Sequence, residues 1–113
     1  MPRHWMPIYW GDYRGDTGHL STVQHGAYLL LIGHYWAHGS LPDDDQQLAN
    51  IARLSLEDWL IHRPIIHAFF YDGWKHKRIE RELKRHTEVY AKRLAASEKG
   101  VMVRAMNRYR NRN

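Results

Sequence analysis

Apolar side chains cover nearly every side of the stretch 21–39, and this pattern predicts the central helix of a small domain. Ser21 and Gln24 stand three residues apart and form a capping box at its start. Gly39 suits the left-handed position that follows a helix. Because other helices pack against a helix that is apolar almost all round, Leu30 at its middle is expected to be buried.

A second capping pattern predicts a shorter helix after a proline-containing connection. Asp43 serves as its N-cap, with Gln46 three residues later. The acidic run 43–45 suits a helix N-terminus, where the helix dipole favours negative charge. One apolar stripe follows, made of Leu48, Ile51 and Ala52.

A third helix is predicted from about residue 56 towards 70, with Ser55 and Asp58 as its capping pair. Pro64 lies inside it, removes a backbone donor and clashes with the preceding turn, so a kink or a break is expected there. The tight connection before Ser55 makes the second and third helices a helix-turn-helix candidate.

The segment 69–78 changes period and predicts a β-hairpin, because Asp72-Gly73 is a strong turn signal between the aromatic strand 69–71 and the basic returning strand 74–78. Three helices followed by a hairpin predict a winged helix. The fold class is therefore expected to be mainly α with a small β-hairpin: a winged helix-turn-helix followed by a basic C-terminal helix.

The helical period returns at Ile79, with Leu83, Tyr90 and Leu94 on one apolar stripe. We expect residues 1–98 to form the winged-helix domain, including this last helix. Residues 99–113 are expected to be a basic tail that is partly disordered, because they offer little core material.

The N-terminal segment 5–13 is dense in aromatic residues. Such a cluster is expected to fasten the N-terminus to the core. The second interpretation is a platform on which unpaired nucleic-acid bases stack.

Charge is distributed unevenly along the 113 residues. Residues 1–70 hold 4 Lys or Arg and 7 Asp or Glu, whereas residues 71–113 hold 13 and 5, giving net charges of −3 and +8. A basic half on a compact domain favours a polyanionic partner, most often nucleic acid.

Several separate motifs, in order along residues 5–95, closely resemble the YdaU-like family of phages and prophages. They are W-M-P-I-Y-W-G-D-Y at 5–13, D-T-G-H-L-S at 16–21, H-G-A-Y-L-L-L at 25–31, L-P-D-D-D at 41–45, R-P at 63–64, F-F at 69–70 and W-K-H-K-R-I at 74–79. That family has no firmly assigned biochemical function. It looks related to the winged-helix domains of DnaD-like replication initiators, which implies a winged helix acting near DNA replication.

The residues expected to bind nucleic acid are the cations of the hairpin and of the helix after it. They are Lys75, Lys77, Arg78, Arg81, Lys84 and Arg85. Several cations on one surface bind the phosphate backbone by releasing counterions. The alternative is a solvated helix face that carries ion pairs. Because the third helix begins with Glu57 and Asp58 rather than base-reading side chains, binding is expected to be weakly specific.

Two function classes therefore stay open. The first is a non-enzymatic phage or prophage DNA-binding accessory of replication, located in the bacterial cytoplasm. The second is a protein-interaction module that docks on, or inhibits, a host or phage protein, or self-associates.

Other chemistry has little support in the sequence. There is no cysteine, so thiolate zinc sites and disulfides are excluded. His34 and His38 stand one helical turn apart, but no third ligand is identifiable, and no metal or other cofactor is expected. No phosphate-binding loop or nucleophile motif is recognisable, and an enzyme is not expected. The first residues contain no apolar run, so no signal peptide or membrane association is expected.

Overall fold

The computed structural model describes residues 5–112, and the side chains of residues 5–108. The described chain is mainly helical, as the sequence predicts. It divides into two compact units, residues 1–82 and residues 83–113, and each is described by itself. The helices are α1 (Trp10–Thr17), α2 (Thr22–His38), α3 (Asp45–Ala52), α4 (Leu56–His67) and α5 (Lys77–Arg112), and α5 contributes to both units.

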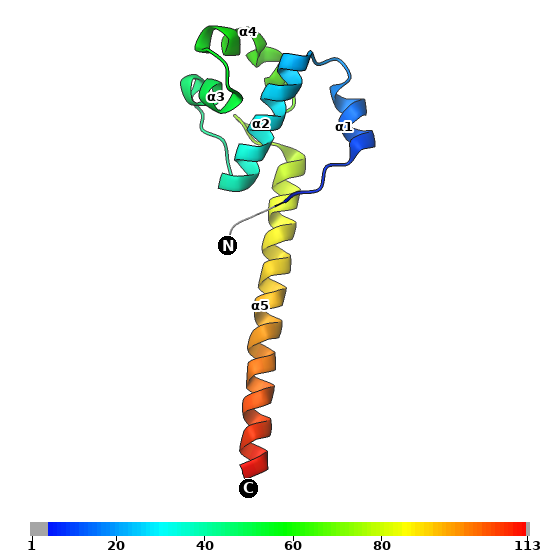
Figure 1. The fold of residues 1–113 in the computed structure, drawn as a ribbon, viewed down its shortest axis with the longest axis vertical. Coiled ribbons are helices and arrows are strands. Elements are labelled where there is room, and N and C mark those ends of the chain that lie inside the picture. The colour runs from blue at the N-terminus through cyan, green and yellow to red at the C-terminus, as the bar shows by residue number, and fades with distance from the viewer. Residues whose placement is uncertain (1–4, 113) are drawn as a thin grey trace. The chain divides into compact units, whose positions relative to one another are not determined.

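The first unit is built around α2, with α3 and α4 on one side and α1 on the other (Figure 1). The predicted capping box is confirmed: the Ser21 side chain accepts from the Gln24 N–H, and the Gln24 side chain accepts from the Ser21 N–H. Gly39 ends the helix at φ 87° and donates its N–H to the Tyr35 carbonyl. The position of the central helix therefore follows from local sequence signals.

The buried side of α2 differs from the predicted one. Leu31 is fully buried, whereas Leu30 keeps 41% of its surface exposed, so the expectation that Leu30 belongs to the core was wrong. A helix that is apolar on nearly all sides gives no amphipathic pattern from which to choose the buried side. The choice is made by the partners of α2. Its buried side chains are Gln24, Ala27, Tyr28, Leu31, Tyr35 and Trp36.

The two following helices begin close to the predicted residues. α3 is capped by Asp44 rather than Asp43, and its carboxylate accepts from the Gln47 N–H at 2.9 Å. Ser55 caps α4 as predicted and accepts from the Asp58 N–H at 3.1 Å. Of the two outcomes predicted at Pro64, the break into two helices was wrong, because α4 continues through Pro64 to His67. The kink stays a prediction.

The predicted hairpin is reduced to one antiparallel bridge between Tyr71 and Lys75, closed by two backbone hydrogen bonds of 2.8 and 3.0 Å. The turn itself is confirmed, since Asp72 and Gly73 both have positive φ angles, 45° and 83°. Trp74, directly after the turn, is buried in the core. Because this side chain holds the loop against the core, the loop does not extend into two strands.

The second unit consists of α5 from residue 83 onward, and the helix continues to Arg112. The segment 99–108, predicted to belong to a partly disordered tail, is helical here. The side chains of Arg110 and Arg112, also assigned to that tail, lie outside the described side chains. The predicted domain boundary at residue 98 stays a prediction. Within residues 5–112, no helix is both long enough and apolar enough to cross a membrane.

Burial predicts opposite outcomes for two adjacent leucines. Leu31→Ala should lower the free energy of unfolding by about 2–5 kcal/mol, because it opens a cavity in the core. Leu30→Ala should change it by less than about 1 kcal/mol, because Leu30 is 41% exposed and its removal opens no closed cavity. Thermal and urea melts of the two variants measure both values. Equal destabilisation by the two substitutions would contradict this packing of α2.

Candidate nucleic-acid interface

The start of α5 is fixed to α2 through His76, the residue before the helix. The His76 Nδ1 lies 3.4 Å from the Ile79 N–H and accepts from it, as an N-cap side chain does. The Nε2 atom therefore carries the proton and donates to the Tyr28 hydroxyl at 2.7 Å. The neutral ring thus connects the first turn of α5 to the central helix.

A second tyrosine of α2 completes this connection. The Tyr35 hydroxyl accepts from the His76 backbone N–H at 3.3 Å and donates to the Glu80 carboxylate. Burial, helped by the hydrogen bond to Glu80, raises the pKa of Tyr35, so its hydroxyl stays protonated. We call Tyr28, Tyr35, His76 and Glu80 the α2–α5 clamp. Ile79, whose N–H the His76 ring caps, is only 1% exposed.

The clamp determines which cations at the start of α5 remain available. Lys77 and Arg81 are exposed and form no ion pair within the described part of the chain. Arg78 is not available, because its Nη2 donates to the Asp12 carboxylate at 3.0 Å and its guanidinium lies 5.6 Å from the centre of the Tyr9 ring. Arg78 thus holds the N-terminal segment, rather than serving as a free phosphate contact.

The other three predicted residues divide between the two units. Lys75, next to the turn, pairs with the Asp72 carboxylate at 3.3 Å, yet its side chain is 56% exposed. An exposed pair of this kind contributes little and leaves the cation open to a stronger anion. Lys84 and Arg85 belong to the second unit, where both are exposed. In the first unit, the structure therefore places Lys75, Lys77 and Arg81 as exposed cations near the turn and the start of α5.

α4, the expected recognition helix, offers no exposed cation in the described structure. The Asp45 carboxylate accepts from the Trp59 indole at 3.0 Å and from the Arg63 guanidinium at 2.8 Å. The Trp59 hydrogen bond, with Arg63, holds the pKa of Asp45 below its ordinary value. Arg63 also lies over the Trp74 ring, 5.4 Å from its centre, so this arginine is committed to packing.

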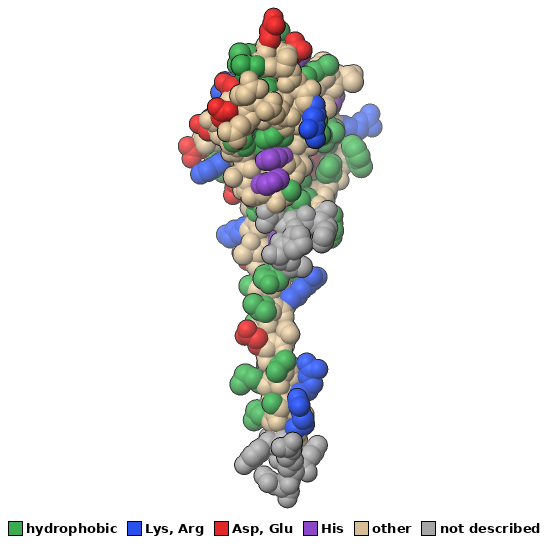
Figure 2. Space-filling model, turned by 60° about the vertical axis from the view of Figure 1, so that its left-hand side comes forward, with side chains coloured by type: hydrophobic (Ala, Val, Ile, Leu, Met, Phe, Trp, Pro, Cys, Tyr) green, Lys and Arg blue, Asp and Glu red, His purple; other side chains and the backbone are tan. Residues whose placement is uncertain are grey.

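Acidic side chains gather on the face of the first unit shown in Figure 2, over the beginnings of α3 and α4. They include Asp43, Asp44, Glu57 and Asp58, all exposed. Because this surface repels phosphate, DNA binding through the face of α3 and α4 is disfavoured. The exposed cations at the start of α5 are the better candidates.

The histidine pair on α2 is close, but its geometry does not make a metal site. The rings of His34 and His38 stack with centres 4.0 Å apart, and His38 Nδ1 donates to the His34 carbonyl at 3.0 Å. Burial and the neighbouring His38 lower the pKa of His34. In the described chain, no group of three or more His, Cys, Asp or Glu side chains is placed to hold a metal.

Sequence reasoning missed Asp12, His76 and the two clamp tyrosines. A signal for the tyrosines was present: Tyr28 and Tyr35 stand two turns apart on the most apolar helix, and a buried tyrosine hydroxyl needs a partner. The partners themselves lie more than 40 residues further along the chain, so no local pattern identifies them.

Comparison with known proteins places the chain among proteins without an assigned activity. Residues 4–84 match a family model described as a protein of unknown function (DUF1376). The chain is 43% identical over 103 residues to the uncharacterised protein YdaU of Escherichia coli (strain K12), a match that covers 88% of this chain and 36% of YdaU. The chain thus spans little more than a third of that relative. No solved structure matches it significantly.

The clamp predicts a specific dependence of stability on pH. Burial, with the positive charges of Arg78 and Arg81, lowers the pKa of His76 to about 4, although Asp16 acts in the opposite direction. A folded-state pKa below the unfolded value of 6.5 means that the stabilisation is complete above about pH 6.5 and is lost as the pH falls towards 4. Protonation removes the Nδ1 acceptor and places a charge at a helix N-terminus.

His76→Gln should remove part of this dependence, because glutamine does not titrate. The Tm of the wild type should fall more between about pH 7 and pH 4.5 than the Tm of the variant. Calorimetry at several pH values measures the difference. Parallel curves for the two proteins would show that His76 does not titrate with folding.

Proposed function

The chain belongs to the DUF1376 family and is YdaU-like, and we propose that it is a non-enzymatic DNA-binding protein, an accessory of phage or prophage replication. It binds the phosphate backbone with weak sequence specificity. The observation that carries this proposal is the pair of exposed cations, Lys77 and Arg81, which the clamp holds one turn apart at the start of α5.

The winged helix belongs to the same proposal. The order of α2, α3, α4, a short turn and α5 corresponds to a minimal winged helix whose wing is the bridged loop 71–75. In this arrangement Lys75 is on the wing, and Lys77 and Arg81 follow it directly. The role in replication rests on the resemblance to the winged-helix domains of DnaD-like initiators.

Weak specificity follows from the state of α4. Its early turns carry Glu57 and Asp58, Arg63 is held by Asp45, and His62 Nδ1 contacts the Gln24 amide at 3.1 Å. Base reading in a groove needs donors that are free to reach base edges. The binding energy therefore comes from charge, and it depends steeply on salt.

The second unit supports the same function through its own cations. Lys84, Arg85, Lys92, Arg93, Lys99 and Arg104 are all exposed there. On the face of this helix that Figure 2 shows, most Lys and Arg side chains lie along one edge and most hydrophobic side chains along the other. A basic helix face of this kind follows a phosphate backbone without reading bases.

A second candidate function, docking on a protein, is favoured by the outer surface of α4. Leu56, Leu60, Ile61 and Ile65 are 39%, 48%, 65% and 43% exposed. Together with the acidic residues beside them, they form an apolar surface with a negative rim. Such a surface suits a basic or amphipathic protein partner rather than DNA.

Removal of two exposed cations tests DNA binding. Lys77→Ala combined with Arg81→Ala should weaken binding to unrelated duplexes alike. With roughly 4 phosphate contacts in the wild type, log affinity should fall against log salt with a slope of about −4, and of about −2 in the variant. Fluorescence anisotropy from about 50 to 200 mM salt measures both slopes.

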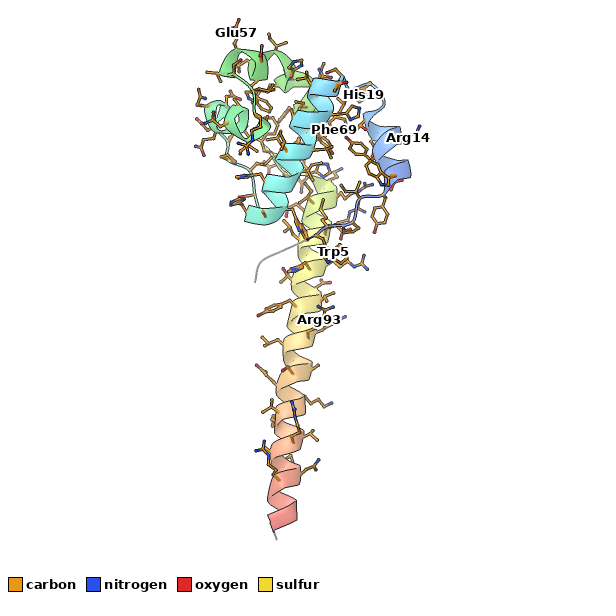
Figure 3. All side chains as sticks on the ribbon, viewed as in Figure 1. Trp5, Arg14, His19, Glu57, Phe69 and Arg93 are labelled. Atoms are coloured by element: carbon orange, nitrogen blue, oxygen red, sulfur yellow. The ribbon has the colours of Figure 1, made fainter. Side chains whose placement is uncertain are left out.

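A matched control carries the same change in charge elsewhere in the first unit. Arg14→Ala with Arg53→Asn removes two exposed cations, and asparagine tolerates the positive φ of 62° at position 53. Arg14 lies on the outer side of α1 (Figure 3). The control should bind almost as the wild type does. Absence of binding at the lowest salt, or equal loss in both variants, would reject the proposal in favour of protein docking.

A further inference from the structure

A cavity of about 430 Å³ lies between α1, α2, the segment 68–71 and the start of α5, all within the first unit. Its size falls within the range of sites for small organic molecules, about 300–1,000 Å³. The proposed binding to the phosphate backbone does not require this cavity, because phosphate contacts need only exposed cations.

Five aromatic side chains form part of the cavity wall, beside aliphatic ones such as Leu29 and Ile32; they are Tyr13, Tyr28, Phe69, Phe70 and Tyr71. Tyr28 is central, with its ring 4.8 Å from Phe69 and 6.4 Å from Tyr13, measured between ring centres. Tyr71, 40% exposed, stands at the rim. Such walls favour a flat, polarisable ligand.

The charges around the cavity favour an anionic ligand. Lys77, Arg78 and Arg81 line it, against the single carboxylate of Asp16. Arg78 is held by Asp12, which fastens α1 beside the cavity, and so Lys77 and Arg81 are left to bind an anion. The cavity thus combines aromatic walls with two free cations at its edge.

We propose that this cavity binds one unpaired nucleotide, with the base against the aromatic walls and the phosphate on Lys77 or Arg81. A base inside a duplex is stacked on its neighbours and cannot enter, so the site selects single strands or strand ends. The inference rests on the proposed function, because the same two cations contact phosphate in both. It adds the ligand class and a preference for unpaired DNA.

Two adjacent leucines of α2 provide the test. Leu29 lines the cavity and Leu30 does not, yet their exposures are similar, 38% and 41%. Leu29→Glu places a carboxylate against the cavity and repels the anionic ligand. Leu30→Glu makes the same change in net charge outside it. Melting temperatures confirm that both variants fold.

The probes are a labelled thymidine strand of about ten nucleotides, a blunt hairpin duplex and free thymidine monophosphate as competitor. Leu29→Glu should weaken strand binding at least tenfold relative to Leu30→Glu, while the two variants bind the duplex within about twofold of each other. Tyr71→Ala should also weaken strand binding about fivefold or more, and Tyr90→Ala, of similar exposure, should not.

The outcomes separate this inference from the proposed function. If free thymidine monophosphate displaces the labelled strand from the wild type but not from Leu29→Glu, a single nucleotide is sufficient to occupy the cavity. If Leu29→Glu weakens strand binding but the free nucleotide does not displace the strand, the cavity binds a nucleotide only as part of a strand. Duplex binding with equal strand affinities in Leu29→Glu and Leu30→Glu overturns the inference alone. No binding to either DNA form overturns both.

Discussion

The first turn of α5 depends on two buried tyrosine hydroxyls of α2. The Tyr35 hydroxyl accepts a hydrogen bond from the His76 backbone N–H, at the end of the loop, and donates one to the Glu80 carboxylate in the helix. Tyr28 holds the His76 ring in the tautomer that caps the helix. Leaving a buried polar group without a hydrogen bond costs about 1–3 kcal/mol. The hydrogen bonds of the clamp and the packing of α2 against the start of α5 therefore depend strongly on each other.

This constraint also sets the chemistry of the surface. Because Ile79 is buried, the helical period directs Lys77 and Arg81 outward and Arg78 towards Asp12. Hydrogen bonds in the core thus determine which cations of this segment remain exposed. The cavity beside them shares Tyr28 and His76 with the clamp, so packing and proposed binding depend on the same side chains.

The sequence predicts the features that local interactions determine. Ser21, Gln24 and Gly39 specify the ends of α2 because each acts within one helical turn. The buried side of α2 could not be predicted, because an almost uniformly apolar helix leaves Leu30 and Leu31 equivalent until its neighbours are known. The predicted hairpin was too long for a similar reason: Trp74 enters the core and limits the loop to one bridge.

The candidate site was predicted only in part for the same physical reason. A count of Lys and Arg identifies the basic segment, but it does not distinguish exposed Lys77 and Arg81 from Arg78, which has a partner 66 residues away. Nor does the sequence show that Arg63, the one arginine of α4, is held by Asp45 and lies over the Trp74 ring. Ion pairs between residues far apart in the sequence decide which cations remain unpaired. No local sequence pattern identifies such ion pairs.

The clamp couples α2 to α5, and a double-mutant cycle measures this coupling directly. Tyr35→Phe removes one hydroxyl and keeps the ring, and Glu80→Ala removes its acceptor. Urea melts of the wild type, both single variants and the double variant give the coupling energy. The expected coupling is about 1–2 kcal/mol, within the range for residues in one hydrogen-bond network. Effects that simply add, within about 0.3 kcal/mol, would contradict it.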